Sequence, residues 1–340
     1  MKNKILLAGL FCCSLISTEA QVLLDKNAGK NSFPIVSPSA NVVVCFDGKD
    51  ETVVRKSVSL FTDDVRRVTG QDLKAQASNP GEVSARYAII VGTAGKSAWI
   101  DALTAKKKID ITPIAGGWER YMIETVDNPA PGIKKAIVVA GSDRRGTAYG
   151  LLSISKAIGV SPWYWWADAP IKQQKKLAVN VHKFVSKEPT VKFRGIFIND
   201  EDWGLMPWSN KTYEPSDVNG EIGPRTNERI FELLLRLRAN TYWPAMHECT
   251  LPFFLTKGNR EVAKKYGIFM GASHCEPMAC SAAGEWRRRG NGAYDYVNNS
   301  AAVYKFWEDR VKEVADQEVL YTLGMRGVHD GKMQGAKTVE

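Results

Sequence analysis

The chain has 340 residues, of which 44% are hydrophobic and 24% are charged, and its formal net charge is +9. This length and balance predict a globular protein with room for two ordinary domains, and they exclude a low-complexity or fibrous chain. The basic residues are scattered except at Arg287–Arg289, so we expect no nucleic-acid partner despite a pI of about 9.1.

The first twenty residues have the pattern of an export signal. Lys2 and Lys4 give a positive start, an apolar run covers Ile5–Ile16, and small side chains precede a cleavage point after Ala20. The run is too short for a permanent membrane-spanning helix, and no later segment reaches that length. We therefore predict removal of residues 1–20, a secreted or periplasmic location and no stable membrane insertion. A lipid anchor on one of the two early cysteines is the less favoured alternative.

Four cysteines follow the signal, namely Cys45, Cys249, Cys275 and Cys280. Export permits disulfides, but four cysteines in so long a chain do not make a disulfide-dense scaffold. Three of them lie near two histidines in the sequence, which leaves zinc binding as an alternative, although the paired C-x-x-C spacing of a structural site is absent. We expect buried free thiols, no metal site and no cofactor.

Residues 21–187 are predicted to form an α/β domain. Helical periodicity covers Asp50–Thr69, which Gly70 closes, and Asp143–Gly159. The β-prone runs are Asn41–Phe46, Tyr87–Val91, Tyr121–Val126, Ala136–Ala140 and Leu177–Phe184. A glycine-rich turn at residues 92–97 resembles the end of a phosphate-binding loop, but Ile90 occupies the position of the first Walker A glycine, so we expect an ordinary helix-capping turn.

A second pattern begins near Pro189, where strand and helix alternate four times. Strands are expected at Phe193–Ile198, Thr241–Trp243, Ile268–Ala272 and Val319–Leu323, and helices at Asn227–Arg238, over a stretch ending with Glu261–Tyr266, and at Tyr304–Ala315. Asn227 is expected to cap the first of these helices. The alternation predicts parallel βα units, and each strand is followed by polar residues, as at the C-terminal rim of a (β/α)8 TIM barrel.

The length of this second part decides how much of a barrel the chain holds. A complete barrel takes about 250 residues, whereas only residues 190–340 follow Pro189. We therefore expect an α/β fold in which the N-terminal α/β domain is followed by the first half of a TIM barrel. Residues 188–340 would be a truncated catalytic barrel, from a longer protein or from a shortened reading frame.

Several strings of this sequence resemble glycoside hydrolase family 115, the xylan α-1,2-glucuronidases. They are GSDRRGTAYG at 141–150, SPWYWWAD at 161–168, FRGIFINDEDWG at 193–204, NTYWPAMHE at 240–248 and GMRGVHDG at 324–331. The resemblance runs from about residue 40 to the end, and family members are much longer. It implies an inverting hydrolase that removes glucuronic acid or its 4-O-methyl ether from xylan. Asp330 matches one catalytic acidic position, and a second functional carboxylate is expected beyond Glu340.

Inverting glycoside hydrolysis needs one protonated carboxyl group and one ionised carboxylate, about 6.5–9.5 Å apart. Asp330 and Gly331 alone are typical of a turn, and the resemblance is what favours catalysis. The acids that follow the predicted strands are Asp200, Glu201, Asp202, Glu248, Glu276 and Asp330.

The remaining candidates are substrate-binding residues. Glu201 and Asp202 would line the pocket, with a structural role as the alternative. Trp243, His247 and Glu248 would form a sugar platform with polar tips. His274 and Glu276 are interpreted in the same way, and for each histidine a purely structural role is an equal alternative.

An arginine completes the set, because a uronic acid carries a carboxylate that a guanidinium binds in a bidentate manner. Arg326 follows the fourth predicted strand and is the candidate, with an ordinary salt bridge as the alternative.

The residues thus favour a glycosidase that acts on glucuronoxylan or xylo-oligosaccharides. Two alternatives remain open, a catalytically inactive fragment that at most binds carbohydrate and another two-domain barrel glycosidase such as a hexosaminidase. A homodimer of the full-length parent is the protein partner considered.

Overall fold

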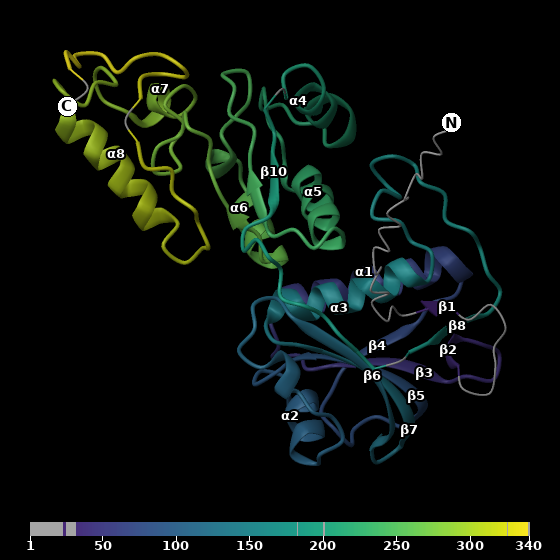
Figure 1. The fold of residues 1–340 in the computed structure, drawn as a ribbon. Helices are drawn as coiled ribbons and strands as arrows, with labels where there is room; N and C mark the ends of the chain where they lie inside the picture. The colour runs from purple at the N-terminus through teal and green to yellow at the C-terminus, as the bar shows by residue number, and fades with distance from the viewer. Residues whose placement is uncertain (1–22, 25–31, 182, 200, 325, 339–340) are drawn as a thin grey trace, which may run out of the picture.

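The computed structural model describes residues 23–24, 32–181, 183–199, 201–324 and 326–338. The predicted export signal lies outside these residues. Figure 1 shows two parts, a lower one built on a large twisted sheet and an upper one that holds the C-terminal elements. Within the described ranges, no helix has the length and apolar character needed to cross a bilayer.

A six-stranded sheet in the order β4-β3-β5-β7-β6-β9 forms the centre of the lower part. The strands β3, β4, β5 and β7 run parallel, whereas β6 pairs antiparallel with β7 and with β9. Successive side chains alternate between the faces, so that Ile89 and Val91 join one core and Ile90 the other. The strands are β3 (Val42–Phe46), β4 (Lys74–Ala77), β5 (Ala85–Thr93), β6 (Tyr121–Ala130), β7 (Ile133–Gly141) and β9 (Phe184–Val185).

Helices cover both faces of this sheet. The helices α1 (Thr52–Thr69) and α3 (Arg144–Ala157) lie on the face toward the upper part, and α2 (Ala98–Ala105) lies on the other, next to the short 3-10 turn η1 (Thr112–Ile114). Gly70 closes α1 in the left-handed conformation, with φ 71°, as predicted. Asp143 caps α3 by accepting a hydrogen bond from the Gly146 amide at 2.8 Å.

A small antiparallel sheet in the order β1-β8-β2 flanks this core, made of β1 (Leu23–Leu24), β2 (Phe33–Val36) and β8 (Leu177–Asn180). The single strand predicted at Leu177–Phe184 is therefore wrong. Its first half pairs with β2, while Phe184 belongs to β9 in the large sheet.

In the upper part, β10 (Gly195–Phe197), β11 (Thr241–Trp243) and β12 (Phe269–Met270) form a parallel sheet in chain order. Residues 318–320 lie beside β12: the Met270 amide donates to the Glu318 carbonyl, and the Leu320 amide donates to the Met270 carbonyl. The strand predicted at Val319–Leu323 is present only as two isolated parallel bridges, Met270–Val319 and Pro277–Thr322.

Helices α5 (Pro224–Arg236) and α6 (Asn259–Tyr266) follow β10 and β11 in the chain. The predicted start of α5 at Asn227 is wrong, because Pro224 occupies the first turn, where its missing N–H costs nothing. Asn227 lies inside the helix, and its Nδ2 donates to the Ile222 and Gly223 carbonyls. The remaining helices are α4 (Leu205–Trp208), the π-turn η2 (Ser209–Tyr213), the 3-10 turn η3 (Phe253–Leu255), α7 (Trp286–Arg289) and α8 (Ser300–Glu313).

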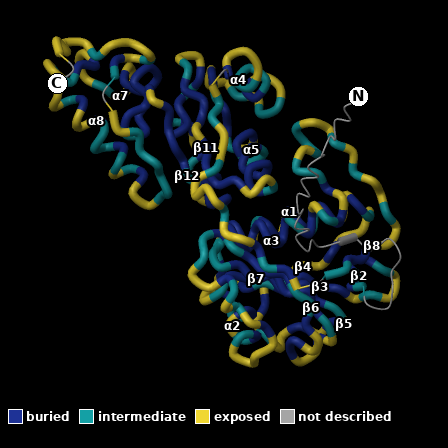
Figure 2. The backbone as a smooth tube through the Cα atoms, viewed as in Figure 1, coloured by how far each residue is buried: buried dark blue, intermediate teal, exposed yellow. Residues whose placement is uncertain are grey.

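One continuous apolar core joins the two parts, and Figure 2 shows buried residues in α1 and α3 of the lower part and in α5 of the upper part. It includes Phe61 from α1, Phe231 from α5 and Tyr266 from α6. The Tyr149 hydroxyl of α3 donates to the Ala239 carbonyl at 3.1 Å, just before β11. The parallel sheet is therefore held in place from below.

A buried ionic network supports the same junction. Arg145 of α3 contacts Glu119 at 2.8 Å and Glu318 at 2.7 Å. Arg194, which precedes β10, also pairs with Glu119, and the Asn240 side chain donates to Glu119 at 2.7 Å. We refer to these five residues as the Glu119 network.

Candidate active site

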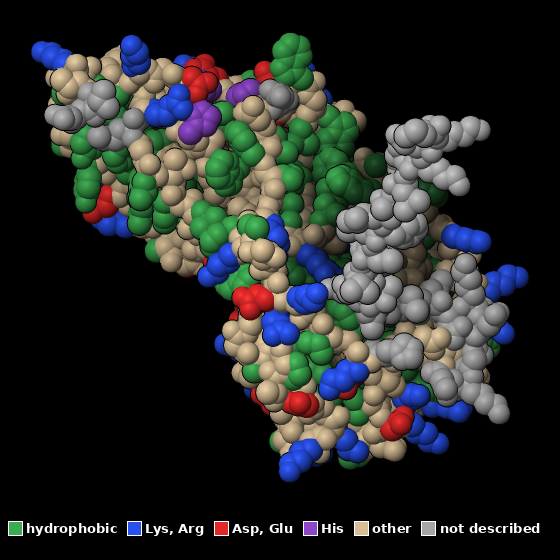
Figure 3. Space-filling view, in the orientation of Figure 1, with side chains coloured by type: hydrophobic (Ala, Val, Ile, Leu, Met, Phe, Trp, Pro, Cys, Tyr) green, Lys and Arg blue, Asp and Glu red, His purple; other side chains and the backbone are tan. Residues whose placement is uncertain are grey.

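The polar residues predicted at the strand ends do gather at one edge of the upper part. In Figure 3, acidic, basic and histidine side chains lie together along its upper border. This edge is where the parallel strands β10, β11 and β12 end, and we call it the rim. Three of the chain's four histidines, His247, His274 and His329, lie in the segments that follow these strands.

Asp330 is the centre of the first cluster on the rim. Its Oδ1 lies 2.9 Å from His274 Nε2 and 3.0 Å from a terminal nitrogen of Arg326. Cys275 Sγ lies 3.7 Å from the same oxygen. The Asp330 side chain is 80% exposed, so this carboxylate faces solvent above its partners.

The hydrogen bond from His274 and the positive charge of Arg326 lower the pKa of Asp330 below its ordinary value. Asp330 is therefore an ionised carboxylate over the whole neutral range. Such a group suits activation of water or stabilisation of positive charge, and it does not suit proton donation.

A second cluster surrounds His247. Asp202 Oδ1 lies 3.2 Å from His247 Nδ1, and both side chains are partly exposed. Beneath them, Glu201 is fully buried and accepts a hydrogen bond from the His247 amide at 2.6 Å. Glu201 thus fixes the backbone of His247, while Asp202 faces the rim. Direct contact of either acid with sugar stays a prediction.

Glu248 extends this cluster toward α7. Its carboxylate contacts Arg287 at 2.7 Å and lies 3.8 Å from His329 Nε2. The rings of His247 and His329 are 6.4 Å apart, so His329 lies near both Glu248 and His247. His329 has a positive φ of 52°, a backbone state that a non-glycine residue rarely adopts.

Trp243 ends β11 on the same side, and more than a third of it is exposed. Its ring packs edge-on against Phe197 at 5.7 Å and covers Gly271, where an added Cβ would lie only 2.1 Å from Trp243 Nε1. The indole is thereby held by the backbone of the next strand, which suits a rigid stacking surface.

Glu276 is a predicted site residue that is not exposed at the rim. Its side chain is buried, and the Ser273 amide donates to it at 3.4 Å. Burial raises the pKa of Glu276 to about 8, and the nearby charge of Glu201 acts in the same direction. In this structure Glu276 supports the loop of His274 and is not on its surface, and substrate contact stays a prediction.

All four cysteines expected in the mature chain are free. Cys45, Cys275 and Cys280 are buried, as predicted, whereas Cys249 is exposed. The ligand atoms of His274, Cys275 and Asp330 all lie within 4.8 Å of one another.

Sequence reasoning missed His329 and Arg287 as members of these clusters, and it considered Cys275 only in the zinc alternative that it did not favour. His329 adjoins Asp330 and could have been included on that ground, but Arg287 is brought to Glu248 only by the fold. Asp200, counted among the strand-end acids, lies outside the described residues.

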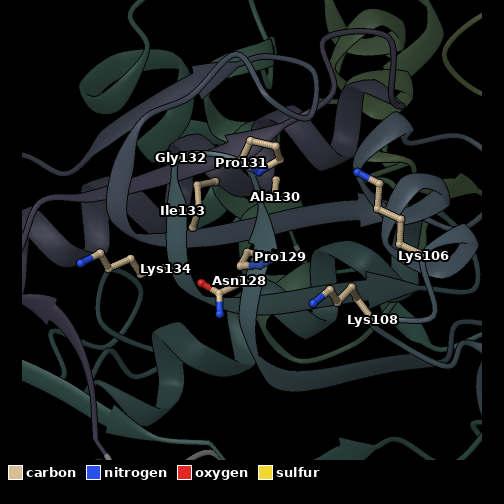
Figure 4. Close-up of a pocket in the computed structure, with 9 residues that line it drawn as sticks. All are labelled: Lys106, Lys108, Asn128, Pro129, Ala130, Pro131, Gly132, Ile133 and Lys134. Atoms are coloured by element: carbon tan, nitrogen blue, oxygen red, sulfur yellow. The ribbon is translucent and has the colours of Figure 1, made fainter.

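A separate hollow of about 490 Å³ lies in the lower part, at the β6–β7 hairpin. Figure 4 shows Asn128 and Pro129 at its centre, with Lys106, Lys108 and Lys134 at the periphery. Its lining holds no carboxylate, histidine or thiol, so it lacks groups for hydrolytic chemistry.

The fold and the rim define an α/β protein in which carboxylates, histidines and an arginine gather where parallel strands end, and carboxylates are the groups that glycoside hydrolysis uses. The sequence model of glycosyl hydrolase family 115 matches residues 186–340. A solved structure, the family GH115 4-O-methyl-alpha-glucuronidase BtGH115A, with specificity for decorated arabinogalactans, is 60% identical over 90% of this chain, with a TM-score of 0.80. The chain belongs to glycosyl hydrolase family 115.

The chain spans 38% of the length of BtGH115A. A more distant solved structure, the chitobiase of Flavobacterium johnsoniae, is 14% identical over 89% of this chain and 43% of its own, with a TM-score of 0.48. No curated protein matches the sequence.

Proposed function

We propose that this chain carries part of the active site of an α-glucuronidase, which removes glucuronic acid or its 4-O-methyl ether from a plant polysaccharide. The observation that carries the proposal is the cluster of Asp330, His274 and Arg326 at the rim of a family 115 chain. Glucuronoxylan and decorated arabinogalactan are the two substrates to compare, because the family resemblance implies the first and BtGH115A is specific for the second.

Asp330 acts as the base in an inverting reaction. A water molecule attacks the anomeric carbon, and Asp330 takes its proton as the glycosidic bond breaks. The leaving oxygen takes a proton from a second carboxyl group, supplied by a part of the whole protein outside residues 1–340. The lowered pKa of Asp330 supports this assignment, because the base has to be ionised before the reaction.

Arg326 binds the carboxylate of the uronic acid. A guanidinium has five N–H donors, and Asp330 takes only one of those on Arg326. Arg326 can therefore hold Asp330 and a substrate carboxylate at once. Trp243 stacks on a sugar face, and His247 with Asp202 contacts hydroxyl groups beside it.

The whole protein is an exported enzyme in which residues 188–340 form the first half of a (β/α)8 barrel, after an N-terminal α/β domain over residues 21–187. The parallel order β10-β11-β12, continued by the Met270–Val319 bridge, supports the barrel. Dimerisation of the whole protein belongs to the same proposal.

The test measures release of glucuronic acid and its 4-O-methyl ether from both polysaccharides, by the 340-residue chain and by the protein extended to the full family length. Asp330→Asn should slow release by the extended protein by about 10²–10⁴-fold, whereas the matched surface change Asp309→Asn on α8 should not. If the 340-residue chain releases no product and the extended protein does, the inactive-fragment alternative holds for the chain alone. If Asp330→Asn retains full activity, the assignment of this site is wrong.

A further inference from the structure

The loop after β12 and the loop that carries Asp330 place three different metal-binding side chains together. His274 Nε2 and Asp330 Oδ1 are 2.9 Å apart, and Cys275 Sγ and Asp330 Oδ1 are 3.7 Å apart. All three ligand atoms fall within 4.8 Å of one another, and no other group of this kind was found among the described residues.

These distances can be compared with those that a metal ion requires. In tetrahedral zinc sites the Zn–N and Zn–O bonds are about 2.0–2.1 Å and the Zn–S bond about 2.3 Å, so neighbouring ligand atoms lie about 3.3–3.6 Å apart. The His274–Asp330 and Cys275–Asp330 distances lie within about half an ångström of these values. The His274 and Cys275 ligand atoms lie within 4.8 Å of one another, and the exposed His274 and Asp330 side chains have room in solvent to rotate toward an ion.

The surroundings also favour a cation. Cys275 is 4% exposed and its amide donates to Ser273 Oγ at 3.2 Å, so the thiol is held in place, while His274 and Asp330 leave the outer side open. Two further carboxyl groups, those of Glu201 and Glu276, are buried nearby. Glu201 Oε2 accepts no hydrogen bond from the described residues.

We propose that His274, Cys275 and Asp330 form a binding site for a thiophilic divalent cation of the zinc class, which blocks the rim. Binding displaces the Cys275 thiol proton to solvent and leaves a metal–thiolate bond, so one proton is released per ion from the thiol. The bound ion also takes the Asp330 oxygen that now contacts Arg326. Arg326 therefore competes with the metal for the same carboxylate.

The test uses Co²⁺ as a spectroscopic substitute for zinc, added to the purified chain. We expect a thiolate-to-cobalt absorption band in the near ultraviolet, tetrahedral bands in the visible, and loss of both when Zn²⁺ is added. Cys275→Ser should remove the thiolate band, and His274→Ala should weaken Co²⁺ binding by about tenfold or more. Cys249→Ser, which changes an exposed cysteine outside the cluster, is the matched control and should keep the wild-type spectrum.

The variant Arg326→Gln should give a result that destabilisation of the fold would not produce. Because it removes the competitor for Asp330, it should tighten Co²⁺ binding several-fold. Absence of the thiolate band in the wild-type chain, its survival in Cys275→Ser, or weaker binding by Arg326→Gln would each overturn the proposal.

The inference shares Asp330 with the proposed function, but metal binding does not require turnover. Zinc binding without glucuronic acid release by the extended protein would refute the function alone. Release that micromolar Zn²⁺ leaves unchanged would refute the block alone.

Discussion

We predict that the Glu119 network stabilises the junction that supports the rim. The Glu119 side chain is 0% exposed and receives hydrogen bonds from Arg145, Arg194 and Asn240, and the Arg145 side chain is only 5% exposed. Glu119→Ala leaves Arg145 buried with part of its charge uncompensated and removes the acceptor for two more donors. Breaking a buried ion pair in this way costs about 3–5 kcal/mol of the free energy of unfolding.

Urea denaturation followed by tryptophan fluorescence measures this loss. The matched control is Asp309→Ala, which removes an exposed pair with Lys305 and should leave the midpoint almost unchanged. Because the network joins α3 to the segments before β10 and β11, Glu119→Ala should also broaden the transition, as the upper part loosens before the lower part. Equal midpoints for Glu119→Ala and the control would refute the reasoning.

Three further predictions concern single groups. In the extended protein, Asp330→Asn should lower kcat by about 10²–10⁴ while the midpoint of urea denaturation stays unchanged, because a general base contributes about that factor. Iodoacetamide at pH 8 should modify Cys249 in the folded chain, while Cys45 and Cys280, whose pKa burial raises to about 12, react only after unfolding, as mass spectrometry of the peptides would show. Burial raises the pKa of Asp50, so the folded chain holds this proton more tightly than the unfolded chain, and its contribution to stability is lost as the pH rises through the folded-state value. Asp50→Asn should therefore gain stability relative to wild type as urea titrations move from pH 4 to pH 7.

The sequence was sufficient to predict elements whose conformation is determined by residues within the element itself. The helix α1 has an apolar face at helical spacing and a glycine in the left-handed state at its end, and both are readable from residues alone. The strand β11 was predicted with its observed bounds, Thr241–Trp243.

Elements that depend on distant partners were predicted less well. Residues 177–184 contain several β-prone side chains, but β2 pairs with the first half and β6 with the second, and the sequence interpretation did not place a break between them. Val319–Leu323 has strand composition but pairs with β12 only through backbone bonds near Met270, so it remains a pair of bridges. In both segments the strand that forms is determined by its pairing with residues distant in the sequence.

The candidate site shows the same division. The strand ends were enough to indicate that Asp330, His274 and Arg326 share one edge. They did not reveal that Arg326 pairs with Asp330 within an irregular loop, or that Glu248 turns toward Arg287 on α7, because both contacts depend on how loops of no regular pattern are placed by the fold.

The polar residues after each strand divide into a buried member and an exposed one. After β10, Glu201 is buried and holds the His247 amide, while its neighbour Asp202 reaches the His247 ring at the surface. After β12, Glu276 is buried against the Ser273 amide, while His274 faces Asp330. An exposed side chain cannot fix its own position, because solvent competes for each of its hydrogen bonds. The buried acids therefore supply the rigidity that the exposed groups lack, which gives a structural reason for the presence of several acids after these strands.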